Sequence, residues 1–460
     1  MALIAASRRR LLQFAAAAAI APGLAGLKAR PVIGRVLAVS DLHSAYERTP
    51  HLLAAFEHEI RSHPVPHVIA INGDIFEQGN VVAQRSDGAV DWAFLAALPA
   101  LAPTVVNLGN HDNDLTPDLA DVVARMKGLG LHVVSTITDT RTGAGYAPPT
   151  ATLPFGDHRL RVVGMATNSM NTYPKASRDQ LSIPAAADWA RANLSDSLTG
   201  ADKVMVMSHA GVVADRDILP LLPEGALMVG GHDHLLFQHL QGASAYVHTG
   251  SFTSAYTVAA FAADGSVTAA SHPVSTDSAA SPALAALTTK TLADQLTPDE
   301  RTVLWTGRRA MSLGDTGRVV AAGMARAAGA HAGFIGHTTL GNAAPAGPVS
   351  HYVFDSIVRF DGALMTTEVT PAQLQVFMSR SNQDHPVALT ARTGDFLYAS
   401  SAPPRRGPIR IVTTDWCATN QQKSFGTADL VFEQASGVTL KSVAASALAG
   451  GWSPEIALWR

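Results

Sequence analysis

The sequence has 460 residues, of which 47% are hydrophobic and 15% charged, a composition typical of a soluble protein with an ample core. Such a length favours two or three domains over one. The formal net charge of −3 argues against a nucleic-acid binder that depends on phosphate contacts. The single cysteine, Cys417, excludes an intrachain disulfide and a cysteine-based metal cluster.

Residues 1–30 are predicted to be a signal peptide rather than part of the fold. A basic segment at 7–13 precedes an uncharged apolar stretch at 14–27, which is too short to span a bilayer comfortably. Consecutive arginines followed by two leucines resemble a twin-arginine export signal, with an ordinary secretion signal or an uncleaved anchor as the alternative. We therefore expect export by the twin-arginine machinery of a bacterium, to the periplasm or the medium, with no stable membrane insertion after cleavage.

Short apolar runs alternate with amphipathic stretches over residues 31–275. We expect buried strands in the β-branched runs at 35–39, 68–71, 104–108, 204–207 and 226–229. Helical spacing of apolar residues follows or precedes these runs at 52–60, 92–98 and 119–126. Later strands at 159–165 and 245–247 lack long helices between them, so part of the sheet is expected to be mixed. The pattern predicts an α/β layered domain, with mixed sheets sandwiched by helices.

The rest of the chain is predicted to form a linker and a smaller α+β domain. Residues 276–300 are rich in Ser, Ala, Thr and Asp, and Ser281 followed by Pro282 is typical of a helix start within this linker. Residues 301–460 combine glycine-rich turns, short strands and helical stretches near 315–328 and 371–379. They contain no constellation of metal ligands, so we expect this domain to shape the pocket, recognise substrate or mediate contacts.

Polar residues that can bind metal follow each of the five apolar runs in the first domain. They are Asp41, His43, Asp74, Asn110, His209, His232 and His234. We expect them to line one rim of a sheet, where carboxylate, amide and imidazole groups suit borderline and hard divalent metals. Seven such groups are too many for one ion and suit two ions that share a bridging carboxylate.

The spacing of these residues indicates how they could converge. Asp74 follows a permissive glycine at a strand end and is the natural bridge between two ions. Asp41 and His43 are two residues apart and would lie on one side of an extended segment, because strand side chains repeat every two residues. His232 and His234 have the same spacing, so both could point at the metal centre.

These blocks, in this order, resemble the calcineurin-like metallophosphoesterases over residues 35–260. The matching motifs are Asp-x-His at 41–43, Gly-Asp at 73–74, Gly-Asn-His-Asp at 109–112, an isolated His at 209 and Gly-His-x-His at 231–234. The resemblance implies that one ion is held by Asp41, His43, Asp74 and His234. It implies that Asp74, Asn110, His209 and His232 hold the other. The ligand types leave Mn, Zn, Fe and Co open as the two divalent metals.

A finer resemblance is to the 5′-nucleotidase branch of this family. There the residue at the position of His111 is a general acid or phosphate contact, and an Asp three residues later orients its ring. Asp114 occupies that position here, and Asp112 is the competing candidate. A helix N-cap is the alternative role for either carboxylate, because Asp is a strong capping residue.

The second half resembles the C-terminal domain of the nucleotidases in blocks at 331–336, 346–350, 353–360 and 369–374. The family's Asn and substrate-holding Arg in the first block are replaced by His331 and Gly336, so its nucleotide-binding residues look eroded. Aromatic side chains that could stack on a base cannot be aligned. The candidates, with packing in the core as the alternative, are Phe396, Tyr398 and Phe425.

The resemblance implies an exported phosphoesterase with a dinuclear metal centre. A metal-bound hydroxide would attack phosphorus, Asn110 would help to stabilise the phosphoryl oxygens and His111 would assist the leaving group as general acid. Asn110 and His111 would thus contact a small phosphate ester, with nucleotides favoured and a role in nucleotide catabolism. The alternatives are a phosphodiesterase, a UDP-sugar or other ester hydrolase of the same family, and a non-catalytic binding protein that retains the fold.

Overall fold

Two six-stranded mixed sheets form the centre of the first domain. The computed structural model describes residues 31–402 and 408–450, so the predicted signal peptide of residues 1–30 lies outside the described residues. The first sheet has the order β14-β13-β1-β2-β3-β4, with strands at Val267–Pro273, Ala255–Ala262, Val32–Val39, His67–Asn72, Thr104–Asn107 and His132–Val134. Strands β1 to β4 are parallel, and β13 and β14 add an antiparallel edge.

The second sheet repeats this mixed plan. Its order is β11-β12-β10-β9-β7-β6, with strands at Leu236–Gln241, Ser244–Thr249, Leu227–Gly230, Lys203–His209, His158–Ala166 and Thr150–Phe155. The four central strands are parallel, and β11 and β6 run antiparallel at the two edges. Parallel neighbours bring their carboxyl ends to one rim, so residues that follow β9 and β10 meet there.

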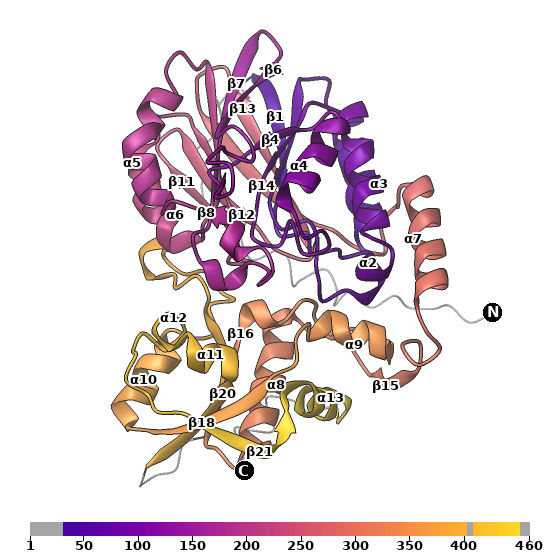
Figure 1. The fold of residues 1–460 in the computed structure, drawn as a ribbon, viewed down its shortest axis with the longest axis vertical. Coiled ribbons are helices and arrows are strands. Elements are labelled where there is room, and N and C mark those ends of the chain that lie inside the picture. The colour runs from indigo at the N-terminus through magenta and orange to yellow at the C-terminus, as the bar shows by residue number, and fades with distance from the viewer. Residues whose placement is uncertain (1–30, 403–407, 451–460) are drawn as a thin grey trace, which may run out of the picture.

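The two sheets pack face to face with helices outside, in four layers (Figure 1). Side chains of β1 alternate between the two faces of the sheet, and both faces are apolar. Val36 and Ala38 face the second sheet, while Leu37 and Val39 face the helices. The outer helices of the first sheet are α1 (Thr49–Ser62), α3 (Ala89–Ala97) and α4 (Leu119–Gly128). Those of the second are α5 (Ala186–Ser197) and α6 (Val212–Ile218).

A helix and a third sheet follow the two sheets of the first domain. Helix α7 (Pro282–Gln295) packs against α1 and α3. The third sheet has the order β19-β16-β20-β18-β21, with strands at Leu397–Ser401, Ala332–Gly336, Ile409–Thr414, Ala363–Val369 and Glu433–Thr439. One face packs on α8 (Leu313–Ala327) and α13 (Leu440–Ala449), and the other on α10 (Pro371–Ser379), α11 (Asp415–Thr419) and α12 (Gln421–Phe425).

The structure confirms the predicted fold class, with mixed sheets between helices and a smaller α+β second domain. All seven predicted strands of the first domain are present, and α1, α3 and α4 coincide with the three helical stripes. The helix predicted after Ser281 is α7, although the Ser281 side chain makes no capping hydrogen bond. The predicted domain boundaries at 275 and 300 stay a prediction. In the described part of the chain, no helix combines the length and apolar character needed to cross a membrane.

Two fully buried asparagines join the sheets beneath the rim. The Asn107 amide on β3 donates to Asn72 Oδ1 and to the Met165 carbonyl, both at 2.9 Å. The Asn72 amide on β2 donates at 3.0 Å to the carbonyls of Ser208 and Val229 in the second sheet. Apolar contacts alone would leave the sheets free to settle in several registers, so these directional bonds specify how the two rims align.

We expect Asn107→Leu to lower the free energy of unfolding by about 1–3 kcal/mol for each buried acceptor left without its donor. Those acceptors are Asn72 Oδ1 and the Met165 carbonyl. Urea unfolding followed by circular dichroism measures the change. Asn193→Leu is the matched control, because the Asn193 amide is exposed and bonds only to the Trp189 carbonyl of its own helix. Equal midpoints for the two variants would contradict the structural role of Asn107.

Candidate metal centre

The seven predicted ligands converge at the carboxyl ends of β1, β2, β3, β9 and β10. Ligand atoms of Asp41, His43 and His234 lie within 4.8 Å of one another, and so do those of a second group, Asp74, His209 and His232. Asn110 adjoins the second group, because its Oδ1 lies 2.8 Å from His232 Nδ1. The structure thus brings all seven together and divides them into two adjacent groups.

The backbone at these positions is left-handed rather than extended. Positive φ angles occur at five ligands, with values of 54° at Asp41, 49° at His43, 54° at Asp74, 75° at His232 and 56° at His234. Asp41 and His43 do enter one group, but the extended segment predicted to bring them together is wrong, since β1 ends at Val39 and the chain turns. His232 and His234 both reach the candidate centre, one in each group, through left-handed backbone rather than an extended segment.

Two glycines let the loops approach closely enough to form these groups. Gly73 has φ +78°, and a Cβ there would lie 2.6 Å from His209 Nδ1. A Cβ on Gly109 would lie 2.3 Å from Asp74 Oδ1. A side chain at either position would displace a ligand, so glycine is a requirement of the site.

Asp74 lies between the two groups. Its Oδ2 is 3.0 Å from His209 Nε2 and 3.9 Å from His43 Nε2, while its Oδ1 accepts a hydrogen bond from the His111 backbone at 2.7 Å. His209 donates from Nδ1 to the Asn72 carbonyl at 2.7 Å, which fixes its tautomer and turns Nε2 towards Asp74. This is the position expected of a shared carboxylate.

The electrostatics of the second group favour a bound cation. Burial alone would lower the pKa of His209, but the carboxylates of Asp74 and Asp41 outweigh it and raise the pKa to about 10. Burial and the charge of His209 lower the pKa of His232 to about 3, so this ring stays neutral with a lone pair available. Asp74 and Asp41 thus favour positive charge in the space between these side chains. A bound divalent ion could supply that charge.

The first group contains polar atoms whose contacts also suit a metal ion. His43 Nε2 and His234 Nε2 face each other at 2.9 Å, and Asp41 Oδ2 is buried without a hydrogen-bond partner in the described structure. Two imidazole nitrogens and a carboxylate oxygen aimed at a common point are a donor set for Mn, Zn, Fe or Co. The residues present therefore fit divalent metal.

His111 and Asp114 form the pair predicted for proton transfer. His111 Nδ1 lies 2.8 Å from Asp114 Oδ2, and the imidazole retains 24% of its side-chain exposure. Burial opposes protonation, but the charges of Asp114 and Asp74 raise the pKa of His111 well above its usual value. Asp112 instead accepts from the backbone of Ile75 at 2.8 Å and of Gly109 at 2.7 Å, so it ties two ligand loops together.

Glu77 is a buried acid of the site that sequence reasoning missed. Its Oε2 lies 3.2 Å from His43 Nδ1, and its Oε1 accepts from the Gly79 backbone at 2.8 Å. Burial opposes ionisation, but the adjacent His43 imidazole prevails and lowers the pKa of Glu77 to about 2. An ionised Glu77 holds a proton on His43 Nδ1 and leaves Nε2 for the metal. Only its position three residues after Asp74 could have pointed to it.

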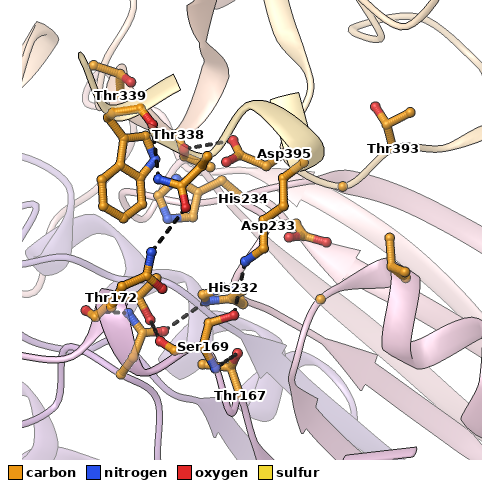
Figure 2. A pocket seen from close by; sticks show the side chains of 18 of the residues that line it. Thr167, Ser169, Thr172, His232, Asp233, His234, Thr338, Thr339, Thr393 and Asp395 are labelled. Atoms are coloured by element: carbon orange, nitrogen blue, oxygen red, sulfur yellow. Dashed lines mark hydrogen bonds between the residues drawn. The ribbon is translucent and has the colours of Figure 1, made fainter. Parts of the chain in front are cut away.

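The ligands form the floor of a cavity of about 1240 Å³ between the two domains. In Figure 2, Thr172 and His232 of the first domain face Thr338 and Asp395 of the second. Asn110 and His111, the two predicted substrate contacts of the first domain, line this cavity. A molecule in it would touch both domains.

The three aromatic residues predicted to stack on a base lie elsewhere. Phe425 is 1% exposed and packs edge to face on Phe334 in the core of the second domain. Phe396 stacks on His337 with ring centroids 4.1 Å apart, and Tyr398 packs edge to face on Phe396. None of the three lines the cavity, because core packing covers their rings, and their predicted stacking role finds no support in these positions.

The second domain supplies other groups that the sequence did not single out. Two aromatic side chains on the cavity wall are substantially exposed, Phe360 at 47% and Trp416 at 41%. Four cationic side chains also line the cavity: Arg216 of the first domain and Arg380, Arg392 and Lys423 of the second. Among the described residues, none of these four forms an ion pair with a carboxylate.

The fold and the paired ligand groups define a metal-dependent phosphoesterase. Residues 34–236 match the family model of the calcineurin-like phosphoesterases. No curated protein matches the chain significantly in sequence.

Solved structures of similar two-domain fold extend the likeness beyond the family domain. A 5′-nucleotidase precursor from Thermus thermophilus is 17% identical, with a TM-score of 0.59 over 90% of this chain and 96% of that one. A 5′-nucleotidase from Candida albicans is 10% identical, with a TM-score of 0.60 over 92% and 100%. The sulfate thiohydrolase SoxB of Thermus thermophilus is 13% identical, with a TM-score of 0.59 over 92% and 95%. At these identities the likeness shows the fold.

We expect Asp74→Ala to weaken divalent metal binding by well over about tenfold, since losing even an outer partner of a ligand typically costs 10–100-fold. Competition with a chromophoric chelator measures the affinity. His111→Asn is the control that retains metal, because the His111 ring is not one of the ligands. Wild-type affinity in a folded Asp74→Ala protein would remove Asp74 from the metal site.

Proposed function

We propose that the protein is an exported phosphatase that hydrolyses nucleotide phosphate esters at a two-metal centre. One observation carries this proposal: two metal-ligand groups and an oriented His111 form the floor of a cavity whose walls carry unpaired cations and exposed aromatic rings. Anionic and aromatic parts of one ligand would find complementary groups there. Export rests on the sequence pattern of residues 1–30.

The two ligand groups support two metal positions. Asp41, His43 and His234 would hold one ion and Asn110, His209 and His232 the other, with Asp74 shared. When bound, two divalent ions neutralise charge on the transferring phosphoryl group and activate the attacking water.

The protein's own residues would handle the leaving group. Asp114 accepts a hydrogen bond from Nδ1 of His111, and the other ring nitrogen carries a second proton when the ring is an imidazolium. The raised pKa of His111 keeps the ring protonated until the proton is transferred to the ester oxygen. His111 would donate this proton to the departing alkoxide.

A cation of the second domain reaches the floor of the cavity from above. Lys423 on α12 donates from Nζ to Ser169 Oγ at 3.0 Å, across the domain boundary. Arg380 supports this arm, because its guanidinium donates to the Lys423 carbonyl at 3.2 Å. Substrate could exchange the Ser169 contact for a charge-assisted bond from Lys423 to a phosphoryl oxygen. Such a cation would replace the substrate-holding charge absent at Gly336.

The exposed aromatic residues favour a nucleotide over a simple ester. Phe360 follows α9 (His351–Ile357), and Trp416 lies on α11, so both belong to the second domain. Exposed large aromatic rings inside a cavity are costly unless a flat ligand covers them. A nucleobase stacked there would leave its phosphate directed to the floor.

The proposal is tested by turnover of AMP, a 2′,3′-cyclic nucleotide, UDP-glucose and bis-p-nitrophenyl phosphate with added Mn or Zn. We expect AMP to be hydrolysed with the highest kcat/KM. His111→Ala should lower kcat for AMP by about 10²–10⁴, the usual contribution of general acid catalysis.

The panel also separates the alternatives. Turnover of the diesters or the UDP-sugar alone would retain the phosphoesterase and reject the nucleotidase assignment. Metal binding without turnover of any ester would favour a non-catalytic binding protein. Wild-type kcat in His111→Ala, at wild-type metal content, would rule out the acid role of His111.

We expect Trp416→Ala to raise KM for AMP about tenfold, because stacking on a base typically contributes about 1–3 kcal/mol. KM for phenyl phosphate should stay unchanged, since this ester does not extend to the second domain. Steady-state kinetics with both substrates measures the difference. Trp416→Phe is the matched variant that keeps a ring and should retain most of the affinity. Equal effects on both substrates would contradict base stacking.

A further inference from the structure

A second anion-binding position lies apart from the metal centre, around Arg392. This side chain is only 8% exposed, yet its guanidinium makes no hydrogen bond to any residue within 31–402 or 408–450. One face of the group covers the Phe237 ring at 4.2 Å, and the residue lines the cavity. A guanidinium carries five donors, and those of Arg392, which are bonded to no protein group, are open to a ligand in the cavity.

The segment that carries Arg392 is held firmly in place. Gln383 binds it on both sides, donating to the Ala391 carbonyl at 3.2 Å and accepting from the Thr393 backbone at 3.1 Å. Gly394 follows with φ +56°, and a Cβ there would lie 2.7 Å from Asp233 Oδ2. Arg392 is therefore presented by a fixed turn rather than a loose loop.

A second guanidinium joins the same position from the first domain. Arg216 on α6 donates from Nη1 to the carbonyls of Thr390 at 2.9 Å and Leu389 at 3.4 Å, and its Nε and Nη2 have no hydrogen-bond partner in the described structure. Asp233, the acid that approaches this turn, already accepts from the Val212 backbone at 2.6 Å. Neither arginine pairs with a carboxylate of the described chain, so two like charges share one end of the cavity without compensation.

We propose that Arg392 and Arg216 bind a second anionic group of the substrate, a phosphate, at a distance from the phosphoryl group that reacts. Guanidinium groups suit this ligand, because their paired N–H donors match two phosphate oxygens. This inference rests on the proposed function for the reacting end of the substrate. It narrows the substrate class to esters with two separated phosphates, such as a nucleoside 3′,5′-bisphosphate.

The position is distinct from the metal floor. In Figure 2, Thr393, the neighbour of Arg392, lies on the opposite side of His232 from Thr172. Lys423 contacts Ser169 on the Thr172 side, whereas Arg216 contacts Thr390 next to Arg392. The cavity thus holds two separate cationic positions, one beside the metal ligands and one at the Arg392 turn.

Kinetics with matched substrates tests the proposal. KM for adenosine 3′,5′-bisphosphate should be lower than KM for AMP in the wild type. Arg392→Gln should raise KM for the bisphosphate by at least about tenfold more than KM for AMP, as expected for losing one charge-assisted contact to the second phosphate. Arg392→Lys should recover part of the loss. Arg159→Gln is the control, because Arg159 is exposed on β7 and pairs with Asp202. Equal increases for both substrates would overturn the proposal.

A binding measurement separates this inference from the proposed function. Calorimetry with inorganic phosphate and chelator-treated protein removes the contribution of the metals. We expect binding to be lost in Arg392→Gln and kept in Lys423→Gln, whether or not the wild type hydrolyses any ester. The reverse pattern, or binding unchanged by Arg392→Gln, would overturn the subsite. Arg216→Gln is the second variant if Arg392→Gln does not fold, with the same expected loss.

Discussion

The site depends on the register between two sheets, and a pair of buried asparagines sets that register. Asn72 and Asn107 use their amide groups to bind carbonyls of the opposite sheet, directly below the ligand loops. Asn72 also offers its own carbonyl to His209, so one residue aligns the sheets and orients a ligand. The candidate ligands come from five loops, and they can meet only if the carboxyl ends of the strands in the two sheets are aligned. The apolar contacts between the sheets supply stability, and the amide bonds supply position.

The two domains contribute opposite chemistry to one cavity. Acids and imidazoles come from the first domain, which concentrates negative charge and lone pairs where metal is needed. Most of the cations and the exposed aromatic rings come from the second, which faces them across the cavity. The cavity therefore combines charges and rings that neither domain supplies alone. Glu77 adds to the negative charge of the first domain. Its ionised carboxylate faces Nδ1 of His43, on the side of the ring away from Nε2.

Much of the fold and the ligand set followed from the sequence, because buried strands and the polar residues at their ends are local patterns. Asp41, Asp74 and His209 could be found this way. Arg392 and Trp416 could not, since their importance lies in burial without partners and in exposure within a cavity, which only tertiary structure determines. Phe425 shows the converse, because an aromatic residue in a core and one in a binding site look alike in sequence. The strand geometry expected at Asp41 and His43 failed because the chain leaves the strand two residues earlier.

The left-handed backbone at the ligands restricts which residues could ever occupy these positions. Asp, Asn and His are the non-glycine residues that most often adopt positive φ, whereas β-branched residues are strained there. The same three types supply the oxygen and nitrogen donors that the metals need. Backbone conformation and ligand chemistry therefore favour the same few residue types at these positions, which are Asp41, His43, Asp74, His232 and His234. During evolution, one of these residue types could replace another without a change in loop conformation. A residue of any other type would require a new loop conformation as well as a new ligand. The candidate metal centre is therefore harder to change by substitution than the cavity wall above it.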